Sequence, residues 1–152
     1  MHNIKGFTLI ETLVAVLVFF IVISSAGRIY TSAYAAYVKN SNKIEVQENM
    51  RFALKKMNRG LRQAVCVVSC NGPEIIIEPA QGDNVYGYRY DPAQKEAEVN
   101  VGGVYLPLAS NITYLKFDYD PAGRVAAITI KGQKGDSAVI EMSTRVQIRT
   151  GY

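Results

Sequence analysis

The residue with the strongest chemical requirement in this sequence is Glu11, a carboxylate inside an apolar run. The run extends from Phe7 to Ala26 and contains no lysine or arginine. A charged side chain at membrane depth costs about 2.5 to 3.5 kcal/mol on insertion scales, so such a group is rarely kept there without a partner or a function. Glu11 therefore requires a cation. The nearest basic side chains are Lys5 before the run and Arg28 after it.

An α-amino group could provide that cation. Cleavage between Gly6 and Phe7 would create a positive terminus about one helical turn before Glu11. Within one subunit the geometry is poor, because the amides of the first turn compete for the carboxylate. A parallel neighbouring helix, shifted along the axis, can bring its amine there more easily. Such a buried pair adds little net stability but fixes register, because leaving either charge alone is unfavourable.

Two cysteines, Cys66 and Cys70, are the other reactive side chains. If this part of the chain is exported, an oxidising compartment favours a small-loop disulfide, and two free thiols are the alternative. A bridge at this spacing would be strained on a continuing helix, so it requires the helix to have ended before it. Two cysteines alone cannot complete a structural zinc site, and the only histidine is His2.

The residues that most enzymes use are scarce. With one histidine, at position 2, a Ser/His/Asp or Cys/His arrangement is not expected. The sequence also contains no glycine-rich phosphate loop with a lysine. Asp118, Asp120 and Gly123 have alternating carboxylates, but the later glutamate of a calcium loop is missing and Asp-Pro-Ala-Gly is a good hairpin turn. We therefore predict no enzymatic activity, no cofactor and no metal.

The elements that position these groups begin with a long helix. Twenty residues from Phe7 to Ala26 span about 30 Å as a helix, which is the thickness of a bilayer's hydrocarbon core. Apolar residues then recur at three- and four-residue steps, which predicts an amphipathic continuation to about Ala64. A weakened segment could occur near Lys39 to Lys43. The predicted segments are 1–6, 7–26 in the membrane, 27–65 as amphipathic helix, and 66–152 as a β-rich domain.

One side of the helix near its end is basic. It carries Lys55, Lys56, Arg59 and Arg62, while the formal net charge of the 152 residues is only +4. The simplest interpretation is a solvated face opposite a core face, and a surface that touches DNA or a partner is the alternative. The tyrosines at positions 30, 34 and 37 are read as packing residues.

After Pro73 the pattern changes to short β-branched and aromatic runs separated by turn residues. Alternation within these runs indicates antiparallel strands with one packed face. We therefore predict an α+β fold in which the helix packs on an antiparallel sheet. The predicted strands are 74–78, 84–90, 95–101, 104–108, 112–119, 125–131 and 138–149.

Residues Lys5 to Glu11 read Lys-Gly-Phe-Thr-Leu-Ile-Glu and precede an apolar helix, which resembles the class III signal of type IV prepilins and type II secretion pseudopilins. The resemblance implies that a prepilin peptidase cuts after Gly6 and methylates Phe7, and that Glu11 is the glutamate at the fifth mature position. It also implies a cytoplasmic leader, a single-pass inner-membrane protein with an exported domain, an inner-membrane assembly platform, and a pilus or pseudopilus built from other such subunits.

The basic helix end before a β-rich domain is similar to W-type minor pilins and J-type minor pseudopilins. A minor pilin of a type IV pilus is therefore our first expectation, with a minor pseudopilin or a tip subunit that binds DNA or a surface as alternatives. Two simpler explanations of the apolar run also stand. One is a secretory signal peptide with its small-residue site at 24–26, although Glu11 argues against it. The other is a plain single-span anchor, because the flanking charges do not decide its orientation.

Overall fold

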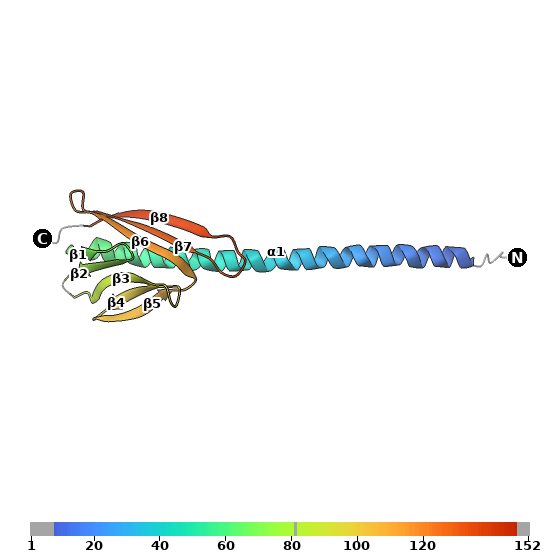
Figure 1. Cartoon of the computed structure of the whole chain (residues 1–152), viewed down its shortest axis with the longest axis horizontal. Coiled ribbons are helices and arrows are strands. Elements are labelled where there is room, and N and C mark those ends of the chain that lie inside the picture. Colours follow the sequence, from blue (N-terminus) through green and yellow to red (C-terminus); the bar gives the residue numbers. More distant parts are fainter. Residues whose placement is uncertain (1–7, 81, 149–152) are drawn as a thin grey trace. The chain divides into compact units, whose positions relative to one another are not determined.

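The computed structural model describes residues 8–80 and 82–148. It contains one helix and eight strands (Figure 1), and the chain divides into two compact units between Val38 and Lys39. The first unit is helical, and the second holds the last part of the helix and all eight strands. The elements are α1 (Leu9–Gln63), β1 (Cys66–Cys70), β2 (Glu74–Glu78), β3 (Val85–Asp91), β4 (Glu96–Val101), β5 (Val104–Ala109), β6 (Ile112–Asp120), β7 (Val125–Gly132) and β8 (Ile140–Gln147).

The helix α1 is continuous for 55 residues and passes through Lys39 to Lys43 as regular helix, so a weakened segment there is not observed. The predicted start at Phe7 lies outside the described residues. The predicted apolar stripe of the second half is confirmed as a buried face, because its side chains follow the three- and four-residue steps of a helix surface. Its buried members are Val46, Met50, Ala53, Leu54, Met57, Gly60 and Leu61.

The strands form two antiparallel sheets in which sequential strands are neighbours. The first sheet has the order β1-β2-β3-β4-β5, and the second has the order β6-β7-β8. Every predicted strand is present with its ends within two residues of those predicted. Two features differ from prediction. Residues Cys66 to Cys70 form an additional strand, and the single predicted sheet is divided into two.

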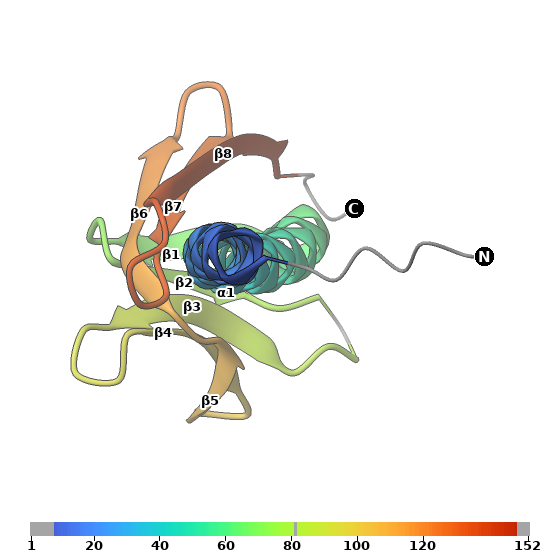
Figure 2. The same ribbon diagram turned by 90° about the vertical axis from the view of Figure 1, so that its right-hand side faces the viewer.

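The last part of α1 packs against both sheets. Figure 2 looks along the helix and shows the strands wrapped around one side of its second half, from β8 above it to β5 below it. From the first sheet, the hydroxyl of Tyr88 donates a hydrogen bond to the carbonyl of Lys56 at 3.2 Å. From the second, the amide of Asn58 donates to Thr144 Oγ1 at 3.5 Å. Each buried Leu or Met side chain of the stripe contributes about 1.5 to 3 kcal/mol, so this packing holds the domain together.

Strand β6 connects the two sheets. Its main-chain N–H at Ile112 donates to the carbonyl of Lys95 at 2.9 Å, and that at Phe117 donates to the carbonyl of Gly72 at 2.6 Å. The thiol of Cys70 also donates to the carbonyl of Phe117 at 3.4 Å. These bonds satisfy main-chain groups at the boundary, where neither sheet can extend its own ladder.

Candidate assembly site at the start of the helix

The predicted processing and assembly residues lie at the N-terminal end of the chain. Gly6 and Phe7 lie outside the described residues, so the cleavage and methylation positions stay predictions. Glu11 lies in the first turn of α1. The described part of the site begins at Thr8.

Thr8 and Glu11 form a reciprocal cap at the start of α1. The main-chain N–H of Thr8 donates to Glu11 Oε2 at 3.0 Å, and the Thr8 hydroxyl donates to the same oxygen at 2.9 Å. In return, the N–H of Glu11 donates to Thr8 Oγ1 at 3.4 Å. This is the capping-box arrangement, which satisfies amides that have no partner within the helix. The position also suits a carboxylate, because the N-terminal end of a helix carries partial positive charge.

The cap changes our view of Glu11. From the sequence we expected its own segment to supply no cation, and the structure shows that Thr8 supplies two hydrogen-bond donors to the carboxylate instead. Both donors are neutral, so they offset part of the desolvation cost of the carboxylate but leave its charge in place. Thr8 was not among the predicted site residues. Its signal was present in the sequence as a threonine three positions before a glutamate at the start of an apolar run.

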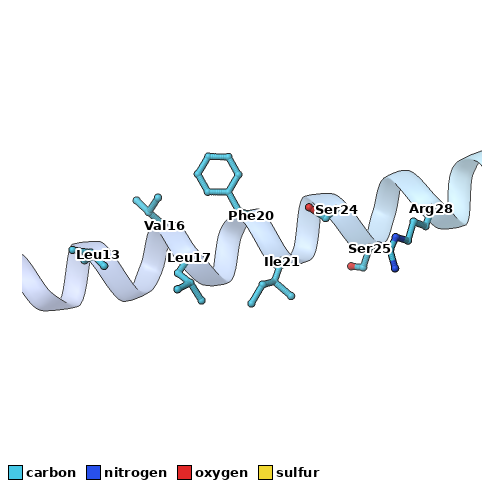
Figure 3. Close-up of a pocket in the computed structure, with 8 residues that line it drawn as sticks. All are labelled: Leu13, Val16, Leu17, Phe20, Ile21, Ser24, Ser25 and Arg28. Carbon is cyan, nitrogen blue, oxygen red and sulfur yellow. The ribbon is translucent and has the colours of Figure 1, made fainter.

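The apolar segment that follows is exposed on every side. Among the described residues, α1 is the one helix long and apolar enough to cross a membrane. The large apolar side chains from Leu9 to Ile23 are all exposed by half or more. Figure 3 shows a shallow groove on this segment, and all of its lining residues come from successive turns of α1. The groove is thus one face of a single helix. Its lining residues are Leu13, Val16, Leu17, Phe20, Ile21, Ser24, Ser25 and Arg28.

Two hydroxyl groups within the segment are hydrogen-bonded to carbonyls of their own helix. The Thr12 hydroxyl donates to the carbonyl of Leu9 at 2.8 Å, and the Ser25 hydroxyl donates to the carbonyl of Val22 at 2.8 Å. Hydrocarbon offers no hydrogen-bond partners, so polar groups there must be satisfied internally. These bonds, like the Thr8 cap, suit the segment to an apolar environment.

The comparison with protein families bears on this same region. Residues 1–27 match the prokaryotic N-terminal methylation motif. No curated protein and no solved structure matches the chain. The motif supports a class III signal of the type IV pilin kind, and so a pilin- or pseudopilin-type subunit that is anchored in a membrane, processed by prepilin peptidase and assembled with other pilins. Proteins with this motif are structural subunits rather than enzymes.

Elsewhere in this pilin-like chain, the predicted disulfide is not formed. Cys66 and Cys70 are free thiols at the two ends of β1. Four residues of extended strand separate two Cα atoms by about 13 Å, and a disulfide requires about 4.4 to 6.8 Å. The helix ends before the cysteines, as a bridge would need, but the chain continues as a strand rather than as a tight loop. A Cys66–Cys70 bridge would therefore require β1 to leave the sheet.

The predicted basic face is present at the end of α1. Lys55, Lys56, Arg59 and Arg62 are all exposed, and within residues 8–80 and 82–148 none of them forms an ion pair.

At the predicted turn, Asp120 accepts a hydrogen bond from the N–H of Ala122 at 3.0 Å, which is a turn contact. The tyrosines at positions 30, 34 and 37 are exposed within the first unit.

Proposed function

We propose that this protein is a minor pilin-like subunit of a type IV pilus, cut after Gly6, methylated on Phe7, and built into or priming the filament. The observation that carries the proposal is Glu11, a carboxylate in the first turn of an exposed apolar helix that matches the methylation motif. A charge in this position needs a cationic partner in an apolar environment. The new terminal amine of a neighbouring subunit provides one.

In this mechanism the apolar helix first holds the precursor in the inner membrane, with the domain on the periplasmic side. After cleavage, an inner-membrane assembly platform moves the subunit from lipid into the filament. Contacts with other apolar helices then replace contacts with lipid, so packing rather than the hydrophobic effect favours assembly. Glu11 sets the register, because a subunit placed too high or too low would bury its carboxylate without an amine.

The Thr8 cap gives this mechanism a defined starting state. Before assembly, Glu11 is held by the N–H and hydroxyl of Thr8. A charged donor forms a hydrogen bond roughly twice as strong as a neutral one, so an incoming amine can add to or replace these bonds. The carboxylate is therefore oriented before the partner arrives, and little side-chain entropy is lost on pairing.

Two alternative functions concern the other end of α1. The basic helix end before a β-rich domain is also compatible with a minor pseudopilin of J type in a type II secretion system. The exposed side chains of Lys55, Lys56, Arg59 and Arg62 favour a tip subunit that contacts DNA or a surface. Deletion of the gene distinguishes a minor pilin from a minor pseudopilin. A minor pilin predicts loss of pili, a minor pseudopilin predicts loss of exoprotein secretion, and the two are measured independently.

The experiment that tests the proposed role of Glu11 compares two charge-neutralising variants in cells. Glu11→Gln should be cleaved and methylated normally but should enter filaments at about one tenth of the wild-type level or less, since a lost buried ion pair costs several kcal/mol. Glu48→Gln is the matched control, because Glu48 is an exposed carboxylate of the same helix outside the apolar segment. Wild-type incorporation of Glu11→Gln into sheared filaments would overturn the register role.

A further inference from the structure

A groove in the domain lies between α1 and the far strands of the first sheet. It encloses about 840 Å³. One wall is a stripe of α1 formed by Phe52, Lys56, Arg59 and Gln63. The other wall comes from β3, β4 and β5, together with described residues of the connection between β2 and β3. The side chains on the sheet wall are mainly apolar: Val85, Tyr88, Val99, Val101, Pro107 and Leu108.

The groove exists because the first sheet is wider than the helix that covers it. In Figures 1 and 2, β5 lies farther from α1 than β1–β3 do. Tyr88 of β3 is buried at 2% exposure beneath the helix, whereas Val99, its partner on β4, is only half-buried. Opposite Val99 on β5, Leu106 is 46% exposed. The inner face of β4 and β5 is thus an aliphatic shelf that no element of residues 8–80 and 82–148 covers.

The helical wall of the groove is positively charged. Lys56 and Arg59 form no ion pair among the described residues, and Asp83 is the one acidic side chain that lines the groove. From Asn49 to Pro73 the sequence has five basic residues and no acidic one. Like charges three or four positions apart on a helix repel each other, so this wall gains stability from an acidic partner. Phe52, at 51% exposure, adds an aromatic ring to the wall.

We propose that the groove binds an amphipathic helix of a neighbouring subunit, with its aliphatic face on the shelf and acidic side chains along the flank facing Lys56 and Arg59. The inference rests on the proposed function, because the neighbour is a subunit of the same filament. Two strands about 4.8 Å apart form a shelf about 10 Å wide, which matches the diameter of one helix. A second helix beside α1 would complete the layer that covers this sheet.

The aliphatic shelf favours a polypeptide over nucleic acid. A phosphate backbone needs cations but gains nothing from Val99, Val101 and Leu108, which only an apolar partner can cover. Lys55 and Arg62 also distinguish the two ligands. They belong to the same basic helix end but do not line the groove. A nucleic acid would use all of these cations, whereas a helix seated in the groove would use Lys56 and Arg59.

The test uses the full chain in detergent micelles and a fluorescent peptide of about five helical turns, with leucines on one face and glutamates along both flanks. The second probe is the same peptide with lysine in place of glutamate, and the third is a short DNA duplex. The charge-reversed pair Lys56→Glu with Arg59→Glu is compared with the pair Lys55→Glu with Arg62→Glu, which has the same net charge. Phe52→Ala tests the apolar wall, and circular dichroism checks that each variant is folded.

We expect the glutamate peptide to bind at least about tenfold more tightly than the lysine peptide. The double variant at Lys56 and Arg59 should weaken binding of the glutamate peptide at least about tenfold, and Phe52→Ala should weaken it about fivefold or more. The double variant at Lys55 and Arg62 should weaken it by less than about threefold. If the glutamate peptide did not bind at low salt, or if both double variants lost the same affinity for it, the proposed helix-binding groove would be overturned. If the protein bound DNA but no peptide, and both double variants abolished the DNA binding, the basic side chains would instead form a nucleic-acid site. The N-terminal mass of the same preparation reports on processing separately, so a processed protein that binds no peptide removes this inference alone.

Discussion

The Thr8 hydroxyl donates a hydrogen bond of 2.9 Å to the carboxylate of Glu11, and the Thr8 N–H adds a second of 3.0 Å. The residue proposed to set the register between subunits therefore also helps to cap the start of its own helix. A helix end in an apolar environment would otherwise leave amides unsatisfied, which is costly where water is absent. The same carboxylate thus caps the helix of the monomer and, in the proposed function, sets the register of subunits in the filament.

Replacement of Thr8 should loosen the start of the helix. Thr8→Val keeps the shape of the side chain but removes the hydroxyl, and loss of a cap costs about 1 kcal/mol. We expect amide hydrogen exchange in the first turn to rise about fivefold in micelles, since that free energy is a factor of about five. Thr8→Ser, which keeps the hydroxyl, should exchange as wild type. Unchanged protection in Thr8→Val would show that the cap does not stabilise the helix end.

Gly60 is required by the close approach of Tyr88. A Cβ at Gly60 would lie 2.1 Å from the Tyr88 hydroxyl oxygen, which is already bonded to the carbonyl of Lys56. Alanine gains about 1 kcal/mol of helix propensity, but overpacking a buried site costs about 1 to 3 kcal/mol. We therefore expect Gly60→Ala to lower the free energy of unfolding by about 1 kcal/mol in urea titrations. In a Tyr88→Phe background the same change should be less destabilising, because the hydroxyl is absent and the nearest ring atom is 3.1 Å from the added Cβ. Equal destabilisation in both backgrounds would contradict the contact with the hydroxyl.

Arg89 lies between a buried carboxylate and an aromatic ring on the outer face of the first sheet. Its Nε donates to Glu98 Oε2, and its guanidinium carbon is 3.7 Å from the centre of the Tyr105 ring. Tyr105 in turn donates to Glu74 Oε1 at 2.6 Å. The bond to Glu98 raises the pKa of Arg89, so the guanidinium stays charged. Glu98 is only 7% exposed, so its charge depends on this partner.

Arg89→Ala should leave the carboxylate of Glu98 buried without a cation. Breaking a buried pair costs about 3 to 5 kcal/mol, and the half-exposed Arg89 reduces this to about 1 to 3 kcal/mol. Urea unfolding of the variant measures the loss. Adding Glu98→Gln to Arg89→Ala should recover part of it, because the buried charge is then absent. No recovery would mean that Arg89 acts through packing on Tyr105 alone.

The reactivity of Cys66 should depend on Glu78. The Cys66 thiol donates to Glu78 Oε2 at 3.2 Å, and this hydrogen bond, with the adjacent negative charge, raises the pKa of Cys66. A raised pKa in the folded state favours folding at low pH, and that contribution is lost as pH rises through the folded pKa. At mildly alkaline pH we expect slow alkylation of Cys66, accelerated severalfold in Glu78→Gln because more thiolate is present.

Peptide mapping by mass spectrometry separates alkylation of Cys66 from that of Cys70. Glu141→Gln is the matched control, because it removes an exposed carboxylate on β8 that does not contact Cys66. The control should alkylate at the wild-type rate. Equal rates in Glu78→Gln and wild type would show that the hydrogen bond does not govern the thiol.

The local elements of the domain were predictable because their sequence signals are local. Ile75, Ile76 and Ile77 form a β-branched run bounded by turn residues, and β2 occupies that run. The stripe from Met50 to Leu61 has helical spacing, and it is the buried face of α1. Strand β1 was missed because Cys66 and Cys70 suggested redox chemistry, although Val67 and Val68 between them are strand formers.

Features that depend on distant contacts were not predictable. The division into two sheets follows from β6 bonding at Gly72 and Lys95 rather than extending the ladder of β5, and no local pattern specifies those partners. The groove arises because one helix cannot cover five strands, which requires the strand order to be known. At the start of the helix, Glu11 was found from its cost in an apolar run, but its bond to Thr8 needed the geometry of the first turn.

The most direct test of the whole account is the intact mass of the native protein together with its N-terminal peptide. We expect the chain to begin at Phe7 and to carry one added methyl group on its terminal amine. We expect Gly6→Val to remain an uncut precursor in the membrane. A native chain that still carries Met1, or one that begins at Gly27, would contradict the proposed role in filament assembly.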